Sequence, residues 1–133
     1  MYRREDLWDS HRMARRKEKT LTDLQKRVIA FRDSRDWKQF NNQKDMALSL
    51  TLEAAEVLEH FQWKVTREEI EAYTRKHKKE IGEELADVLY WVLTMNHDLG
   101  IDMADAFEKK MVKNAKKYPL KKSKGHPNKY TEL

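Results

Sequence analysis

Two stretches of the chain decide its fold: LSLTLEAAEVLEHFQWK at residues 48–64 and EIGEELADVLYWV at residues 80–92. Both are rich in Leu, Ala and Glu, which have high helix propensity, and neither contains Pro. In each stretch the apolar residues recur at intervals of three and four, which is typical of one face of an amphipathic helix. We therefore expect two long helices that pack through their apolar faces.

Each of these helices carries a pair of acids at the edge of its apolar face. With a rotation of about 100° per residue, Glu53 and Glu56 flank the apolar arc of the first helix. Glu84 and Asp87 take the same two positions on the second helix. Ionised carboxylates are costly to bury unless a cation or protons compensate their charge. Two E-x-x-[ED] pairs on facing helices also supply the hard oxygen ligands that suit Mg²⁺ or Mn²⁺.

The acids also fit two other kinds of structure. A single E-x-x-E pair usually caps a helix or forms ion pairs with nearby Lys and Arg. A di-iron carboxylate bundle needs Glu-x-x-His on two helices, but none of His60, His77 and His97 follows a Glu by three positions. The four acids together favour a divalent cation, with Mg²⁺ as the expected ion and Mn²⁺ as a further possibility.

The rest of the chain is predicted to be helical as well. Thr66 and Glu69 form a capping-box pattern that indicates a helix start. Gly100 fits a helix end, and Asp102 fits the start of a last helix that Pro119 cannot continue. The expected elements are helices at residues 21–35, 44–63, 66–99 and 102–118, a break or kink at Gly82, and an aromatic loop at 36–43. The expected fold class is all-α, a bundle of four or five helices.

The composition argues against several other classes of protein. Three Gly and two Pro in 133 residues leave few turn positions, which makes β-sandwiches, barrels and Gly-rich phosphate loops unlikely folds. The absence of Cys excludes disulfides, thiolate zinc sites and a cysteine nucleophile. Residues 1–19 lack the apolar core of a signal peptide, so we expect a cytoplasmic protein without a membrane span.

Charge is distributed unevenly along the chain, although the net charge is only +5. Residues 1–19 carry seven Lys or Arg and four Asp or Glu, and residues 109–133 carry nine Lys against one Glu, whereas the middle is acidic. We expect residues 1–19 to be a basic extension and residues 20–133 to form one domain. Basic ends suit polyanions, so one alternative function is a non-catalytic helical module that binds nucleic acid or protein. Because such ends are commonly just solvated, nucleic acid is not the expected main partner.

The two acid pairs resemble the metal-binding motif of the all-α MazG-like nucleoside triphosphate pyrophosphohydrolases, which is E-x-x-E, a variable gap, and E-x-x-D. Four further segments are similar to the dCTP pyrophosphatase branch of that superfamily: RDWKQF (35–40), FQWK (61–64), KMVKNAKKYP (110–119) and KYTEL (129–133). One E-x-x-E is a weak signal, but five segments in the same order are a strong one. The resemblance extends over about residues 20–133.

The resemblance implies an enzyme that converts a (d)NTP to the monophosphate and pyrophosphate. Glu53, Glu56, Glu84 and Asp87 would hold Mg²⁺, which bridges the triphosphate and activates a water for in-line attack. This chemistry agrees with the residues, because a bound metal allows an acidic site to accept an anionic substrate. A regulator that acts through nucleotide pools would share these sequence features.

The resemblance also assigns residues to the substrate. Those expected to contact the nucleotide are Trp37, Phe40, Asn41, Trp63 and Trp91 around the base, and Lys110 and Asn114 at the phosphates. Trp91 fits the hydrophobic core equally well, and Lys110 fits a solvated basic helix face. Asn41 and Val28 stand where relatives often have His, so the base is left open between dCTP and a modified or non-standard nucleotide.

Residues 85–95, LADVLYWVLTM, are apolar on nearly all sides of their helix. Such a helix needs more than one apolar partner, and a chain of this size has a limited core. Leu85, Leu89 and Leu93 lie away from the acid pair on the helical wheel. We expect them to pack against a second subunit, which would complete the bundle in a homo-oligomer, and the resemblance implies a dimer or tetramer. The first or last helix of the same chain is the alternative partner.

Overall fold

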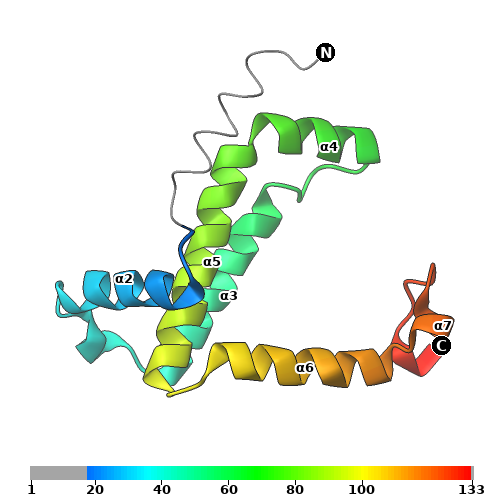
Figure 1. The fold of residues 1–133 in the computed structure, drawn as a ribbon. Helices are drawn as coiled ribbons and strands as arrows, with labels where there is room; N and C mark the ends of the chain where they lie inside the picture. Colours follow the sequence, from blue (N-terminus) through cyan, green and yellow to red (C-terminus); the bar gives the residue numbers. More distant parts are fainter. Residues whose placement is uncertain (1–17, 133) are drawn as a thin grey trace, which may run out of the picture. The chain divides into compact units, whose positions relative to one another are not determined.

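The computed structural model describes residues 18–132, which contain helices and turns but no β-strand (Figure 1). The elements are α2 (Leu21–Asp33), the 3₁₀ turn η1 (Trp37–Phe40), α3 (Gln43–Glu59), α4 (Arg67–Lys76), α5 (Lys78–Asp98), α6 (Met103–Lys117), α7 (Leu120–Ser123) and the 3₁₀ turn η2 (Tyr130–Glu132). The all-α fold class is thereby confirmed. Most of the expected basic extension at residues 1–19 lies outside the described residues, so the predicted domain limits stay predictions.

The helix boundaries that depend on capping side chains agree with the sequence. Thr66 and Glu69 form a capping box at the start of α4, in which each side chain accepts a hydrogen bond from the other's backbone N–H. The Asp102 carboxylate accepts the backbone N–H three residues later and begins α6. Gly100 has φ +64°, the left-handed conformation that commonly follows a helix end.

Two helix ends differ from the sequence prediction. The helix predicted to reach Trp63 ends at Glu59, because the backbone N–H groups of Phe61 and Lys64 bond to the carbonyls three residues before them in tight turns. The stretch predicted to break at Gly82 breaks at His77 instead, where φ is −113° and ψ is 25°. Gly82 lies inside α5, so the predicted kink is wrong.

The aromatic segment after α2 is more regular than the predicted loop. It forms η1, which follows Asp36 in a left-handed conformation with φ 54°. Asn42 then caps α3 by accepting the backbone N–H of Asp45 at 2.9 Å.

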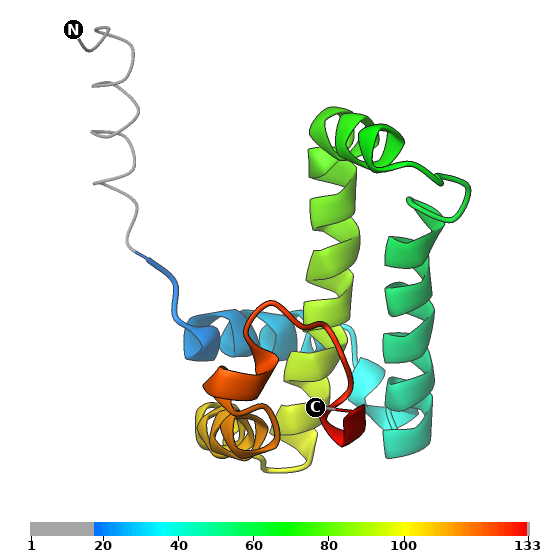
Figure 2. The same cartoon turned by 90° about the vertical axis from the view of Figure 1, so that its right-hand side faces the viewer.

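The described chain comprises two compact units, and the division falls inside α5 after Thr94. In the first unit α3 and α5 run side by side in opposite directions, and α4 connects them at one end (Figures 1 and 2). The α2 helix crosses α5, where the Gln25 side chain donates a hydrogen bond to the Leu93 carbonyl at 3.3 Å. Met46 and Leu93 are 1% and 2% exposed, respectively, and Thr94 is also buried. Leu93 therefore belongs to the core of this unit, and the expectation that it packs against a second subunit is wrong.

The second unit, residues 95–133, contains α6, α7 and η2. Within it the rings of Tyr118 and Tyr130 meet edge to face at 6.0 Å, and the Lys117 ammonium lies 4.8 Å from the centre of the Tyr130 ring. Among residues 18–132, no helix combines the length and apolar character needed to cross a membrane.

Candidate active site

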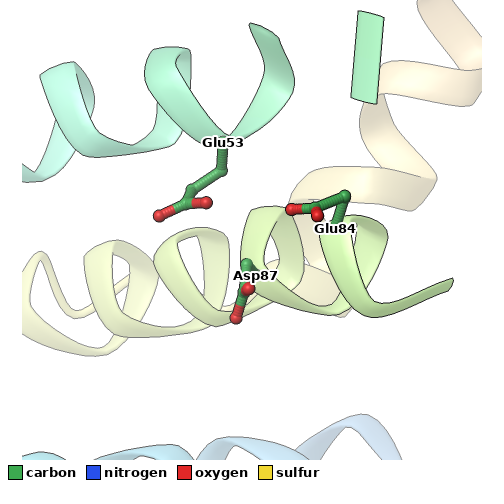
Figure 3. A group of neighbouring side chains, drawn as sticks. All are labelled: Glu53, Glu84 and Asp87. Carbon is green, nitrogen blue, oxygen red and sulfur yellow. The ribbon is translucent and has the colours of Figure 1, made fainter. Parts of the chain in front are cut away.

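Three carboxylates gather between α3 and α5 (Figure 3). Glu53 extends from α3 toward α5, and Glu84 and Asp87 come from α5. One oxygen atom from each carboxylate lies within 4.8 Å of the others. Glu53 and Glu84 are partly buried, whereas Asp87 is exposed. At these separations one cation can contact all three groups, and without a cation their negative charges repel.

The fourth acid, Glu56, lies beside this cluster. The negative charge of Glu84 and a hydrogen bond with its carboxyl group raise the pKa of Glu56, and the charges of Glu59 and Asp87 add to the effect. Glu56 is exposed, in contrast to the expectation from its place on the helical wheel. The raised pKa indicates that negative charge accumulates here without a positive partner.

The four acids meet because two local spacings face one another. Residues three positions apart on a helix lie on the same side. Because α3 and α5 run side by side, the acid-bearing side of α3 can face the acid-bearing side of α5. Among the described residues, none of the four acids forms an ion pair with a Lys or Arg. The local ion pairs considered as an alternative are therefore not formed, and the set of carboxylate oxygens fits a hard divalent cation.

A pocket of about 450 Å³ opens beside the carboxylates. The residues that line it are Arg27, Val28 and Phe31 of α2, Trp37 of η1, Asn41, Glu53 of α3, and Asp87, Tyr90 and Trp91 of α5. Its volume lies in the range of small-molecule sites, and its aromatic walls with a few polar groups are typical of them. The pocket therefore joins an aromatic compartment to two of the acids.

The aromatic side chains of the pocket form a series of edge-to-face contacts. Phe31 meets Trp37 with ring centres 5.8 Å apart and meets Tyr90 at 6.3 Å. Tyr90 in turn meets Trp91 at 5.2 Å. The series ends at the acids, where the indole N–H of Trp91 donates to Glu53 Oε1 at 3.4 Å. Trp91 thus has a polar contact with a candidate metal ligand.

The turn before α3 holds Trp37 at the pocket. The Gln39 amide donates to the backbone carbonyl of Asp36 at 3.1 Å and to its carboxylate at 2.6 Å. These two bonds stabilise the left-handed conformation of Asp36, which is uncommon for a residue other than Gly. The Arg35 guanidinium also lies 3.6 Å from the centre of the Phe31 ring.

The structure brings together some of the residues predicted to bind substrate. Trp37, Asn41 and Trp91 line the pocket with the acids. Phe40 and Trp63 are 68% and 81% exposed and are not among its lining residues. Neither residue lines this pocket, and their role toward the base stays a prediction.

Lys110 and Asn114, predicted to contact the phosphates, lie on α6 in the second unit. Their spacing of four residues places the two side chains on the same side of that helix. Lys110 is exposed and Asn114 is partly buried. Their role stays a prediction.

Sequence reasoning did not assign Arg27, Phe31 or Tyr90 to the pocket. Tyr90 follows Asp87 by three positions, and this spacing alone indicates that the two share a helix side. Phe31 follows Leu24 and Val28 at the spacing of one helix face, a pattern that does not separate a core residue from a pocket wall. Arg27 gave no signal, since one Arg on an exposed helix is ordinary.

A protein-family model matches this chain from within α3, the first acid-bearing helix, to the C-terminus. A family model described as MazG-like matches residues 48–133, which include both acid pairs. The chain belongs to the MazG-like family.

Curated relatives of this MazG-like chain include mouse dCTP pyrophosphatase 1, which is 35% identical over 117 residues. The human protein of the same name is 32% identical over 117 residues. Each alignment covers 87% of this chain and 69% of the relative. Among solved structures, a pyrophosphatase from Archaeoglobus fulgidus is similar with a TM-score of 0.73 and 36% identity, covering 78% of this chain and 96% of that one. The similarity therefore extends from sequence to fold.

Proposed function

We propose that the protein is a Mg²⁺-dependent pyrophosphohydrolase that converts a (d)NTP, with dCTP or a modified nucleotide as the preferred substrate, to the monophosphate and pyrophosphate. The relatives support assignment as a nucleotide pyrophosphohydrolase. One observation carries the finer proposal: the acid cluster opens directly into a pocket with aromatic walls. A triphosphate and a flat base need these two environments side by side.

The four acids are the proposed catalytic and metal-binding residues. Glu53, Glu84 and Asp87 converge closely enough to share one cation, and Glu56 adjoins them through Glu84. When bound, Mg²⁺ would offset the negative charge of the phosphate oxygens and lower the pKa of a coordinated water, and Mn²⁺ offers similar chemistry. The carboxylates then have two tasks, which are to orient the cation and to hold it between α3 and α5.

The aromatic compartment is the proposed base site. Trp37, Phe31 and Trp91 present flat rings, and stacking on such rings contributes on the order of 1–3 kcal/mol per base. Asn41 adds both a hydrogen-bond donor and an acceptor at the same pocket. The base would lie among these residues while the triphosphate extends toward the acids.

Four residues outside the pocket keep their proposed roles. They are Phe40 and Trp63 for the base and Lys110 and Asn114 for the phosphates. The exposed indole of Trp63 and the cation of Lys110 are accessible to a ligand. Substitution of each by Ala, with KM measured for a nucleotide and for inorganic triphosphate, separates base contacts from phosphate contacts.

The test is hydrolysis of a panel of the eight common NTPs and dNTPs and 5-modified dCTPs with Mg²⁺ and with Mn²⁺. Release of pyrophosphate and monophosphate supports the proposal, whereas release of orthophosphate contradicts it. Absence of turnover with every nucleotide, together with salt-sensitive binding to DNA, would instead favour a non-catalytic module that binds through its basic ends. Glu53→Gln should be inactive, and the control Glu83→Gln, which changes the residue next to Glu84 outside the acid cluster, should keep wild-type activity.

A further inference from the structure

Arg27 lies on α2 and lines the pocket together with the aromatic residues and two of the acids. It precedes Phe31 by four positions, so the two side chains share one side of the helix. Among the described residues Arg27 forms no hydrogen bond or ion pair. In particular it does not pair with Glu53 or Asp87, although both acids line the same pocket. A permanent cation is therefore available to a ligand.

The position of Arg27 relates it to the base more than to the phosphates. Its neighbours on the α2 wall of the pocket are Val28 and Phe31, which are apolar. The acids that would hold the cation and the triphosphate come from α3 and α5 instead. A base that stacks on Phe31 would present its edge toward Arg27, which lies one turn earlier on α2.

The guanidinium group has a specific hydrogen-bonding capacity. It carries five N–H donors in a fixed planar fork and has no acceptor. Such a fork pairs best with two adjacent acceptor atoms, because both hydrogen bonds then form in parallel. Besides the two acids, the pocket is lined by the side-chain amide of Asn41, whose oxygen is a hydrogen-bond acceptor.

We propose that Arg27 is a specificity-determining residue that donates two hydrogen bonds to a pair of adjacent acceptors on the nucleobase. The inference rests on the proposed function and adds a substrate preference to it. Guanine presents such a pair at O6 and N7, and cytosine presents one at O2 and N3. Adenine and thymine alternate donors and acceptors along the corresponding edges. Arg27 therefore selects guanine and cytosine nucleotides over adenine and thymine nucleotides.

The experiment compares kcat/KM for dCTP, dGTP, dATP and dTTP between the wild type and Arg27→Met. Methionine keeps an unbranched apolar stem and removes the donors. The expected result is that the wild type prefers dCTP or dGTP by roughly tenfold over dATP and dTTP, a factor typical of one bidentate arginine contact, and that the variant loses this preference. The separate dCTP and dGTP values decide which acceptor pair is used, and 7-deaza-dGTP, which lacks N7, should lose the advantage of dGTP in the wild type alone.

Two further variants separate base recognition from charge. Arg27→Lys keeps the positive charge but not the fork, so it should not restore the preference. Lys26→Met removes an equal charge from the next residue, which does not line the pocket, and should behave as the wild type. Quenching of tryptophan fluorescence by dCMP, dGMP, dAMP and dTMP without metal measures the same preference independently of catalysis.

Each other outcome has a defined meaning. An equal loss for all four nucleotides in Arg27→Met, recovered in Arg27→Lys, would assign Arg27 to the phosphates and overturn the proposal. An unchanged preference in Arg27→Met, or a wild type without the preference, would also overturn it. Turnover of the panel by the wild type in these cases would leave the proposed function intact, whereas no turnover of any nucleotide would reject the proposed function itself.

Discussion

At the scale of single residues, the acids act as a group because their positions prevent each from being compensated locally. Glu53, Glu84 and Asp87 converge on one point, and Glu56 has a raised pKa through the charge of Glu84 and a hydrogen bond with it. The free energy of this repulsion is present in the folded protein and relieved when the chain unfolds. A cation that binds only the folded state therefore has two effects, which are to complete the site and to stabilise the fold.

We predict that Glu53→Gln and Asp87→Asn each lower kcat on the order of a hundredfold or more, because each removes a proposed ligand of the cation. Without metal, both variants should unfold at the wild-type temperature or above it, since each loses one repelling charge. Addition of Mg²⁺ should raise the unfolding temperature of the wild type and of Glu83→Gln, but not of the two variants. Thermal unfolding with and without Mg²⁺ checks this, and activity within threefold of the wild type would reject the metal assignment.

Trp91 leads to a second prediction, since its indole N–H holds Glu53 at 3.4 Å. Trp91→Phe keeps an aromatic ring for packing but removes this donor. Partners that orient a metal ligand typically contribute 10- to 100-fold to metal affinity or activity, and the long contact places our expectation at roughly tenfold. Titration of Mn²⁺ by electron paramagnetic resonance measures the affinity directly. An unchanged Mn²⁺ affinity would show that the contact does not orient Glu53.

At the scale of helices, the sequence predicts starts better than ends. Starts depend on capping side chains such as Thr66 and Asp102, which satisfy N–H groups within three residues of themselves. The end of α4 at His77 has no such capping signal in the sequence, although the His77 ring stacks on that of Tyr73, four positions earlier, at 4.2 Å. Gly82 costs about 1 kcal/mol relative to Ala within a helix, and the 21-residue helix α5 continues through it.

The candidate site likewise has a part that the sequence predicts and a part that it does not. The acid pairs were predictable because a spacing of three residues determines which helix side they share. The pocket wall on α2 was not, because an apolar face and a lone Arg carry no information on which neighbour they meet. Phe40 and Trp63 lie in the turns before and after α3, and their sequence pattern likewise carries no information on which neighbour they meet.

The capping boxes lead to a prediction about pH. The backbone N–H groups of Thr66 and Val65 donate to the Glu69 carboxylate and lower its pKa, and the N–H of Thr20 does the same for Asp23. A lowered folded-state pKa means that stability is present above the ordinary pKa of the group and is lost as the pH falls through the folded value. Glu69→Gln removes this titration, so the wild type should be more stable than the variant at neutral pH.

The difference should shrink as the pH falls below about 4.5, the ordinary value for Glu. Urea unfolding followed by circular dichroism at several pH values between neutral and acidic measures the free energy of unfolding for both proteins. Glu68→Gln, at the next position of the same helix turn, serves as the control. A wild-type to variant difference that stays constant with pH would contradict the proposed capping contribution.

At the scale of the whole molecule, many of the large apolar side chains in residues 18–132 are exposed. Leu48, Leu52 and Leu58 of α3 are 55%, 56% and 64% exposed, and Leu85 of α5 is 53% exposed. Large apolar surface of this kind commonly marks an interface between proteins. It supports the prediction of a homo-oligomer, with Leu85 in the interface and Leu93 now excluded from it by its burial.

We predict that light scattering at micromolar concentration gives a mass of at least two chains. Leu85→Lys should shift the protein toward the monomer, because an ammonium group buried in an apolar interface lacks a partner. Gln62→Lys places the same charge at an exposed polar position and should leave the mass unchanged. A single-chain mass for the wild type would reject the oligomer, and an unaffected oligomer in Leu85→Lys would reject this interface.

The left-handed Asp36 and the Gln39 amide that secures it have a consequence for how such a protein can diversify. The acids are set in two long helices, where a change of backbone would disturb the fold, whereas Trp37 is held by a turn of a few residues with its own hydrogen bonds. Substitutions in this turn can alter one wall of the pocket while the acids keep their positions. The residues proposed for the reaction and the wall proposed for base recognition therefore lie on separate elements. Base preference can change through substitutions in residues 36–41 while the acids stay in place.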